Sequence, residues 1–286
     1  MRKRVDEVCW KLLLAVLSLG GCGGVSTQEG EARVRLGPAP VLTCKPDPKY
    51  RWLDALNHPY SDAFRKSFSY EQADVEVRFA RKAPMFRGTL TARKLKPNFA
   101  YQMKLVGMPP SLWGEKGDSD SNRRIGEVGR WWKPGKDAGN AYFLDAEKDK
   151  DQMEGYLLFG YFVTDADGAA EASFCADSSC HVLWKTSQWP PATGDAKPTR
   201  HPIVAVAGRR GYDQSFPEGE LELYAEAQYG RPPIGAMRLP PGAYRCFFLL
   251  TEESFHSYTD EAGGDWAAAL AAEIRFAIVP PPSGEK

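Results

Sequence analysis

Alternating apolar and polar positions predict most of the strands in this chain. Val75, Val77 and Phe79 occupy every second position, and Leu90 and Ala92 continue the alternation. A period of two is typical of strands that bury one face. Further strands are expected at residues 181–185, 203–207, 221–227, 244–250 and 273–279. Strands at this spacing, without alternating helices, predict an antiparallel β-sandwich.

Three segments add detail to this pattern. Residues 156–163 are almost continuously apolar, as in a central strand covered on both faces. The turn T-D-A-D-G at residues 164–168 separates them from A-A-E-A-S-F, which predicts a β-hairpin. Residues 265–272, W-A-A-A-L-A-A after an aspartate, predict a short helix because the aspartate suits an N-cap.

A turn motif makes the fold prediction more specific. Residues 95–101 read L-K-P-N-F-A-Y and precede alternating Met103 and Leu105. This phrase resembles the tyrosine corner of fibronectin type III and related immunoglobulin-like sandwiches. The resemblance implies a mainly β, Greek-key sandwich in which the Tyr101 hydroxyl bonds to backbone near the preceding turn. Residues 239–244, L-P-P-G-A-Y, repeat the arrangement, and the turn at 164–168 is similar to one in bacterial immunoglobulin-like repeats.

The connection at residues 107–151 is too long for an ordinary sandwich loop. We expect part of it to fold against the sheets, because disordered segments avoid tryptophan. Indole rings on loops can stack on sugars or anchor a protein partner. Alternatively, they close the ends of the sandwich and are buried. The candidate binding patch consists of Trp113, Trp131, Trp132 and, from a later connection, Trp189.

The N-terminus indicates where the protein resides. Basic residues at positions 2–4, an apolar stretch at 12–19 and the sequence L-G-G-C ending at Cys22 form a secretory signal. The stretch is too short to cross a bilayer, which needs about 20 apolar residues. L-G-G-C resembles the lipobox of bacterial lipoproteins, which implies that Cys22 is acylated and anchors the chain to a membrane. Gly23 implies, by the same resemblance, the outer membrane or cell surface. The alternative is an ordinary cleavage site, with Cys22 kept for a disulfide.

These observations divide the chain of 286 residues into one main domain with flanking segments. We expect a signal peptide at 1–21, a lipid-anchored tether at 22–44, an N-terminal segment packing on the domain at 45–74, the β-sandwich at 75–280 and a tail at 281–286. The chain has 37 basic and 37 acidic residues. This balance argues against a nucleic-acid partner, because no excess of positive charge is present.

Four cysteines remain beyond the signal and Cys22. An oxidising compartment favours disulfides, although the spacing does not decide the pairing. Cys175 and Cys180 enclose only A-D-S-S and are the first choice, which leaves Cys44 with Cys246. The alternative is that these residues are buried thiols.

Candidate metal ligands are few, and catalytic signatures are absent from the sequence. It has no G-x-S-x-G, H-E-x-x-H or glycine-rich phosphate loop, which favours a non-enzymatic role. Asp165 and Asp167 could supply oxygen ligands to calcium. The alternative is that they belong to a simple turn. His58 and His201 precede prolines and are expected in loops. A possible set of copper or zinc ligands comprises His181, His256, Glu252 and Glu253. The alternative is that these residues are ordinary hydrogen-bonding groups at strand ends.

Taken together, the sequence predicts an envelope-anchored lipoprotein whose β-sandwich serves as a binding module for a glycan or an envelope protein. A purely structural module in a larger assembly fits the same features. The alternative from a different class is a copper- or zinc-binding periplasmic or surface protein. An enzyme with a site assembled from distant loops also stays open.

Overall fold

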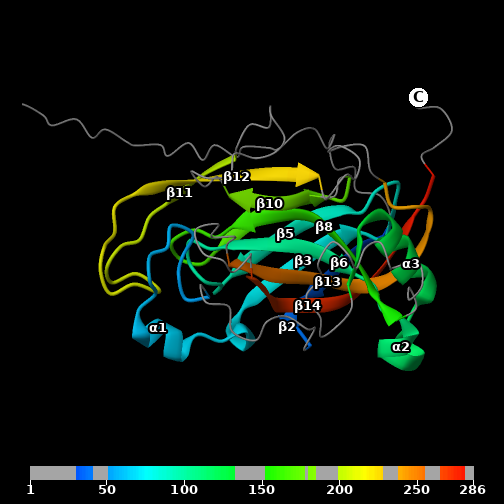
Figure 1. Ribbon diagram of the computed structural model, residues 1–286, viewed down its shortest axis with the longest axis horizontal. Coiled ribbons are helices and arrows are strands. Elements are labelled where there is room, and N and C mark those ends of the chain that lie inside the picture. The colour runs from blue at the N-terminus through cyan, green and yellow to red at the C-terminus, as the bar shows by residue number, and fades with distance from the viewer. Residues whose placement is uncertain are drawn as a thin grey trace, which may run out of the picture.

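The structure is a computed structural model that describes residues 30–40, 51–132, 152–177, 180–184, 199–227, 238–254 and 265–280. It is mainly β, and its strands pair antiparallel apart from one short parallel contact (Figure 1). The strands form three sheets. The described part of the chain contains no helix that is long and apolar enough to span a membrane.

Two larger sheets form the body of the molecule. The four-stranded sheet has the order β1 (Glu31–Arg35), β3 (Asp74–Ala80), β5 (Arg87–Arg93) and β9 (Ala170–Cys175). The seven-stranded sheet has the order β2 (Gly37–Pro38), β14 (Asp265–Ile278), β13 (Gly242–Ser254), β6 (Ala100–Val106), β8 (Glu154–Val163) and β7 (Arg130–Trp132), and β4 (Lys82–Ala83) pairs with β14. Their facing sides meet in an aromatic core: Phe174 of β9 lies 5.5 Å from Phe248 of β13, between ring centroids. The alternating apolar residues of β3 and β5 belong to this core.

A smaller sheet and short helices complete the fold. The three-stranded sheet has the order β10 (Cys180–Trp184), β12 (Gly219–Ala227) and β11 (Thr199–Ile203). The helical elements are α1 (Asp62–Ser67), η1 (Tyr70–Gln72), α2 (Pro110–Trp113), η2 (Gly114–Lys116) and α3 (Ser119–Val128). α1 lies at one end of the long axis, and α2 and α3 lie at the other (Figure 1).

Two local predictions are wrong. The alanine-rich segment 265–272 is not a helix but the first part of β14. Pairing with β13 and β2 on its two sides outweighs the high helix propensity of alanine. The turn at 164–168 does not close a hairpin, because β8 pairs with β6 and β7 whereas β9 pairs with β5 in the other sheet. The chain therefore crosses from one sheet to the other at this turn.

Two strands also begin or end elsewhere than expected. Residues 203–207 are predicted as a strand, yet β11 covers Thr199–Ile203 and stops where that segment begins. Residues 31–38, which fall within the expected tether, form β1 and β2 and pair with β3 and β14. This part of the chain belongs to the domain: β1 and β2 are edge strands of the two larger sheets, and Ala32 and Leu36 are buried in the main core.

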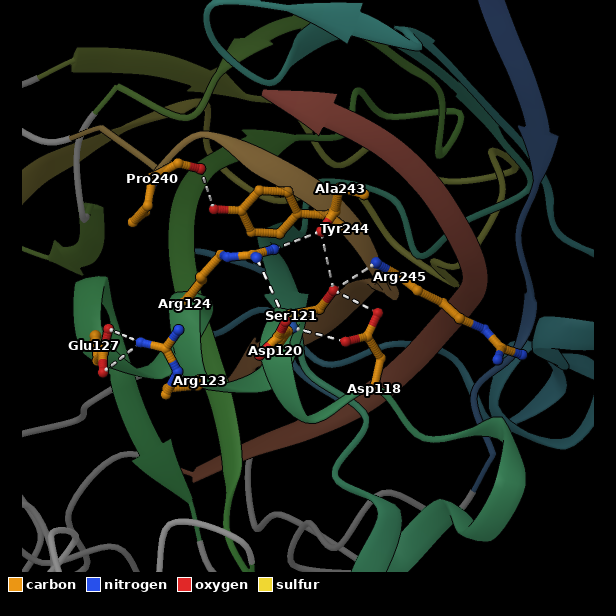
Figure 2. A network of polar contacts seen from close by, with 10 residues as sticks. All are labelled: Asp118, Asp120, Ser121, Arg123, Arg124, Glu127, Pro240, Ala243, Tyr244 and Arg245. Carbon is orange, nitrogen blue, oxygen red and sulfur yellow. Dashed lines mark hydrogen bonds and ion pairs between the residues drawn. The ribbon is translucent and has the colours of Figure 1, made fainter. Parts of the chain in front are cut away.

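The long connection after β6 folds against the sheets, as predicted, over its described residues 107–132. The N-terminus of α3 is fixed to β13 by a polar network (Figure 2). Asp118 caps the helix by accepting the Ser121 amide at 2.9 Å, and the Ser121 hydroxyl accepts the Arg245 amide at 2.8 Å. Arg124 donates to the Ala243 carbonyl at 2.8 Å. These contacts attach the start of α3 to β13.

Candidate functional site

The turn at residues 95–101, hereafter the corner turn, organises the polar interior at the α1 end. The Lys96 amide donates to the Tyr101 hydroxyl at 3.2 Å, so the hydroxyl-to-backbone contact predicted for the tyrosine corner is confirmed. Thr164 fixes the turn from the other side, since its hydroxyl donates to the Lys96 carbonyl at 2.6 Å and accepts the Phe99 amide at 2.9 Å. The second motif behaves similarly: the Tyr244 hydroxyl donates to the Pro240 carbonyl at 2.6 Å (Figure 2).

A fully buried ion pair lies beneath the corner turn. The Lys96 ammonium is 2.9 Å from Glu252 Oε2, and both side chains are 0% exposed. Lys96 also donates to the Arg51 carbonyl at 2.6 Å, and the Tyr70 hydroxyl donates to Glu252 Oε1 at 2.6 Å. Burial and the Glu252 charge raise the pKa of Tyr70 well above its usual value, which keeps this hydroxyl protonated as a donor.

Aromatic rings enclose the Lys96 ammonium. It lies 4.9 Å from the ring centroid of Trp52 and 4.6 Å from that of Phe99. Attraction between the cation and the ring faces adds to the ion pair in this desolvated position. Phe68 contacts the edge of Trp52, with centroids 6.3 Å apart. The indole is therefore held in place from below and from the side.

A surface hollow of about 260 Å³ opens beside this indole and is lined by Trp52, Asp62, Arg65 and Lys66. The three charged residues come from α1, which begins at an N-cap where the Ser61 hydroxyl accepts the Phe64 amide. Phe64 faces the core, so its polar neighbours face outward. The Arg65 guanidinium carbon is 5.8 Å from the Trp52 centroid, and Arg65 lies 3.5 Å from Asp62. Two cations thus oppose one anion around an indole.

A second buried carboxylate holds the segment before α1. Asp54, 0% exposed, accepts the backbone amides of Leu56 and His58 at 2.8 and 2.9 Å. Its other oxygen accepts the Tyr212 hydroxyl at 2.9 Å and lies 3.1 Å from His58 Nδ1. The His58 ring stacks on Phe216 at 4.4 Å. Because the carboxylate only accepts, His58 donates from Nδ1, and the residue closes a tight loop.

Of the tryptophans in the predicted patch, one is buried and two are half-buried. Trp131 is 5% exposed and packs with Met153. Trp113 packs on Phe247, with centroids 4.9 Å apart, and half-buried Trp132 contacts the edge of the Tyr156 ring. Trp189 lies outside the described residues. The alternative that these tryptophans are buried therefore holds for Trp131, since its ring offers almost no surface to a ligand.

Of the predicted metal set, only Glu252 has a described side chain. Glu252 is occupied by Lys96 and Tyr70. Backbone pairing places His181 on β10 and Glu253 on β13, whereas His256 lies outside the described residues. The described part of the chain has no group of three or more histidine, cysteine, aspartate and glutamate side chains suited to a metal.

Asp165 and Asp167, the candidate calcium ligands, make contacts within and beside the turn at residues 164–168. Asp165 accepts the amides of Asp167 and Ala169, each at 2.9 Å, and Asp167 lies 3.4 Å from the Arg209 guanidinium. Gly168 has a φ of +73°, which the turn requires. A side-chain oxygen that bonds two amides is typical of an Asx turn.

No disulfide bond occurs within the described part of the chain, so the predicted bridges are not found there. Cys246 is a fully buried thiol, and burial raises its pKa well above the usual range. Its expected partner Cys44, like Cys22, lies outside the described residues. Cys175 ends β9 and Cys180 begins β10, in different sheets.

One further buried carboxyl has a shifted pKa. Glu154, at the start of β8, is 5% exposed. Burial raises its pKa to about 7, and the neighbouring Trp113 indole opposes part of the shift. Burial therefore favours the protonated form of this carboxyl more than in an exposed glutamate.

Comparison of the chain with protein families, with curated proteins and with solved structures finds no match. Sequence reasoning missed the Lys96–Glu252 pair and the hollow at Trp52. A usable signal is present: Lys96 lies inside the motif L-K-P-N-F-A-Y, where a buried position is expected, and a buried lysine needs a partner.

Proposed function

We propose that this protein is an exported, membrane-anchored lipoprotein whose β domain is an immunoglobulin-like sandwich acting as a binding module. The lipobox-like sequence ending at Cys22 supports the anchor. The two tyrosine-corner contacts, at Tyr101 and Tyr244, support the kinship with immunoglobulin-like sandwiches. Neither feature requires catalysis.

The hollow beside Trp52 is the proposed ligand site, and a glycan is the proposed ligand. The observation that carries this proposal is the rigidly supported indole at a surface hollow rimmed by Arg65 and Lys66. An aromatic face held in place binds a sugar ring with little loss of conformational entropy. Copper or zinc binding is the less favoured function, because Glu252 is already paired with Lys96.

The anchor and the ligand site are tested separately. For the anchor, mass spectrometry of the mature protein is expected to find an acylated N-terminal Cys22, and Cys22→Ser is expected to abolish both acylation and removal of residues 1–21. An unacylated Cys22 in the mature parent protein would refute the lipoprotein assignment.

For the ligand site, the full chain is applied to a glycan array together with Trp52→Phe and Arg65→Gln. Leu112→Ala is the control, since Leu112 is a large, exposed apolar side chain on α2. The two hollow variants are expected to lose binding and the control to retain it. Array binding that survives both hollow variants would exclude the hollow as the ligand site.

A further inference from the structure

The charge around the hollow has a clear sign. Arg65 and Lys66 face one carboxylate, Asp62. Arg51 lies 5.4 Å from the Trp52 ring and is paired with Glu252 at 3.5 Å, so it is not part of this excess. The whole chain has no net charge, so this excess of positive charge is local. The buried Lys96–Glu252 pair contributes nothing to it, because its charges cancel. A surface of this kind favours an anion over a neutral ligand.

The Arg65 guanidinium is available to a ligand. Its contacts with the described residues are long: 5.8 Å to the Trp52 centroid, near the limit of about 6 Å for a cation–ring interaction, and 3.5 Å to Asp62. Its side chain is 47% exposed. An incoming carboxylate can therefore replace Asp62 as the partner and accept two parallel hydrogen bonds from the guanidinium fork.

The size of the hollow restricts the ligand. Sites for drug-sized molecules occupy about 300–1,000 Å³. A hollow of about 260 Å³ is smaller and suits one ring with its substituents. The apolar face of such a ring can pack on Trp52 while its acid group reaches Arg65 and Lys66. Asp62 disfavours a more highly charged group such as a phosphate.

We infer that the hollow recognises a carboxylate-bearing sugar ring, such as a uronic acid unit of a glycan. This inference rests on the proposed binding function and names the ligand class for that same site. Trp52 contributes the stacking surface, Arg65 the fork for the carboxylate and Lys66 a second positive charge.

The test is an NMR titration of the full chain that follows the ¹H–¹⁵N signals of the indole groups. Trp52→Phe identifies the Trp52 signal by its loss. The probes are D-galacturonate, D-galactose, which differs at C6 alone, acetate and glucose 6-phosphate. Galacturonate is expected to shift the Trp52 signal with an affinity at least about tenfold higher than that of the other three, as for the loss of one charge-assisted pair.

A variant and its matched control locate the effect. Arg65→Gln is expected to remove most of the preference for galacturonate over galactose. Arg78→Gln is the control, because Arg78 is also 47% exposed but lies on β3. It is expected to leave the preference unchanged.

The outcomes separate this inference from the proposed function. Equal affinity for galacturonate and galactose would overturn the carboxylate preference while leaving a glycan site at Trp52. Tighter binding of acetate alone or of glucose 6-phosphate would also overturn it, by showing general anion binding or phosphate recognition. A Trp52 signal that no probe moves would overturn it, while array binding lost in Trp52→Phe would still uphold the proposed function.

Discussion

Replacing Lys96 by methionine tests the buried ion pair beneath the corner turn. At 2.9 Å and an effective dielectric constant of about 20, the attraction between the Lys96 and Glu252 charges is about 6 kcal/mol. Desolvation of both groups offsets much of this attraction. Removing Lys96 leaves the Glu252 charge buried, with the more distant Arg51 guanidinium 3.5 Å from Oε1 as its remaining cation. Loss of one partner of a buried pair costs about 3–5 kcal/mol of stability. We therefore expect Lys96→Met to destabilise the protein by that amount.

The assay is urea unfolding followed by circular dichroism, with the loss read from the midpoint at an unchanged slope. The control is Arg123→Ala, which breaks the Arg123–Glu127 pair on α3. That pair has a similar separation, 3.1 Å, but its side chains are 52% and 39% exposed. An exposed helical pair is worth only about 0.3–0.5 kcal/mol. Burial is thus the main difference between the two variants.

A double variant isolates the pair itself. Lys96→Met with Glu252→Gln removes both charges, and we expect it to recover at least about 2 kcal/mol relative to the sum of the single losses. Additive losses, or a Lys96→Met variant no less stable than Arg123→Ala, would refute the interpretation that a charged pair is buried here.

Three further predictions concern stability. Tyr101→Phe leaves the buried Lys96 amide without its acceptor and is expected to cost about 1–3 kcal/mol in urea unfolding. Glu154→Gln is expected to flatten the pH dependence of stability. The pKa of Glu154 is about 7 in the native state, against 4.5 for an unperturbed glutamate. The stability that Glu154 contributes is therefore fully present below pH 4.5 and is lost, by up to about 3 kcal/mol, as the pH rises through 7. Gly168 has a φ of +73°, and the Leu95 carbonyl would lie 2.1 Å from an added methyl. Gly168→Ala is therefore expected to reduce the free energy of unfolding by more than about 2 kcal/mol and to lower the melting temperature accordingly.

Each of these predictions has a contrary result. A Tyr101→Phe variant as stable as the parent protein would show that the tyrosine corner is not stabilising. A parent protein whose stability changes with pH in the same way as that of Glu154→Gln would show that Glu154 does not titrate as described. Gly37→Ala is the control for Gly168→Ala, because no atom lies within 4 Å of its added methyl. Equal melting temperatures for the two glycine variants would contradict the steric argument.

The sequence by itself determined the elements that depend on neighbouring residues. Alternation places Val77 and Leu90 on the inner face of their strands, since successive side chains point to opposite faces. The corner turn was recognisable for the same reason: Pro97 and Tyr101 are close in sequence, and the hydroxyl contact closes a short loop of chain.

Tertiary structure alone decided the pairing of strands and the composition of the site. The alanines of β14 form a strand because β13 and β2 supply hydrogen-bonding partners, which no local pattern reveals. The site likewise joins groups far apart in the chain, such as Tyr70 and Glu252, which are separated by 182 positions. Local spacing carries no information about such contacts, because they form only when the sheets pack and remove these polar groups from water.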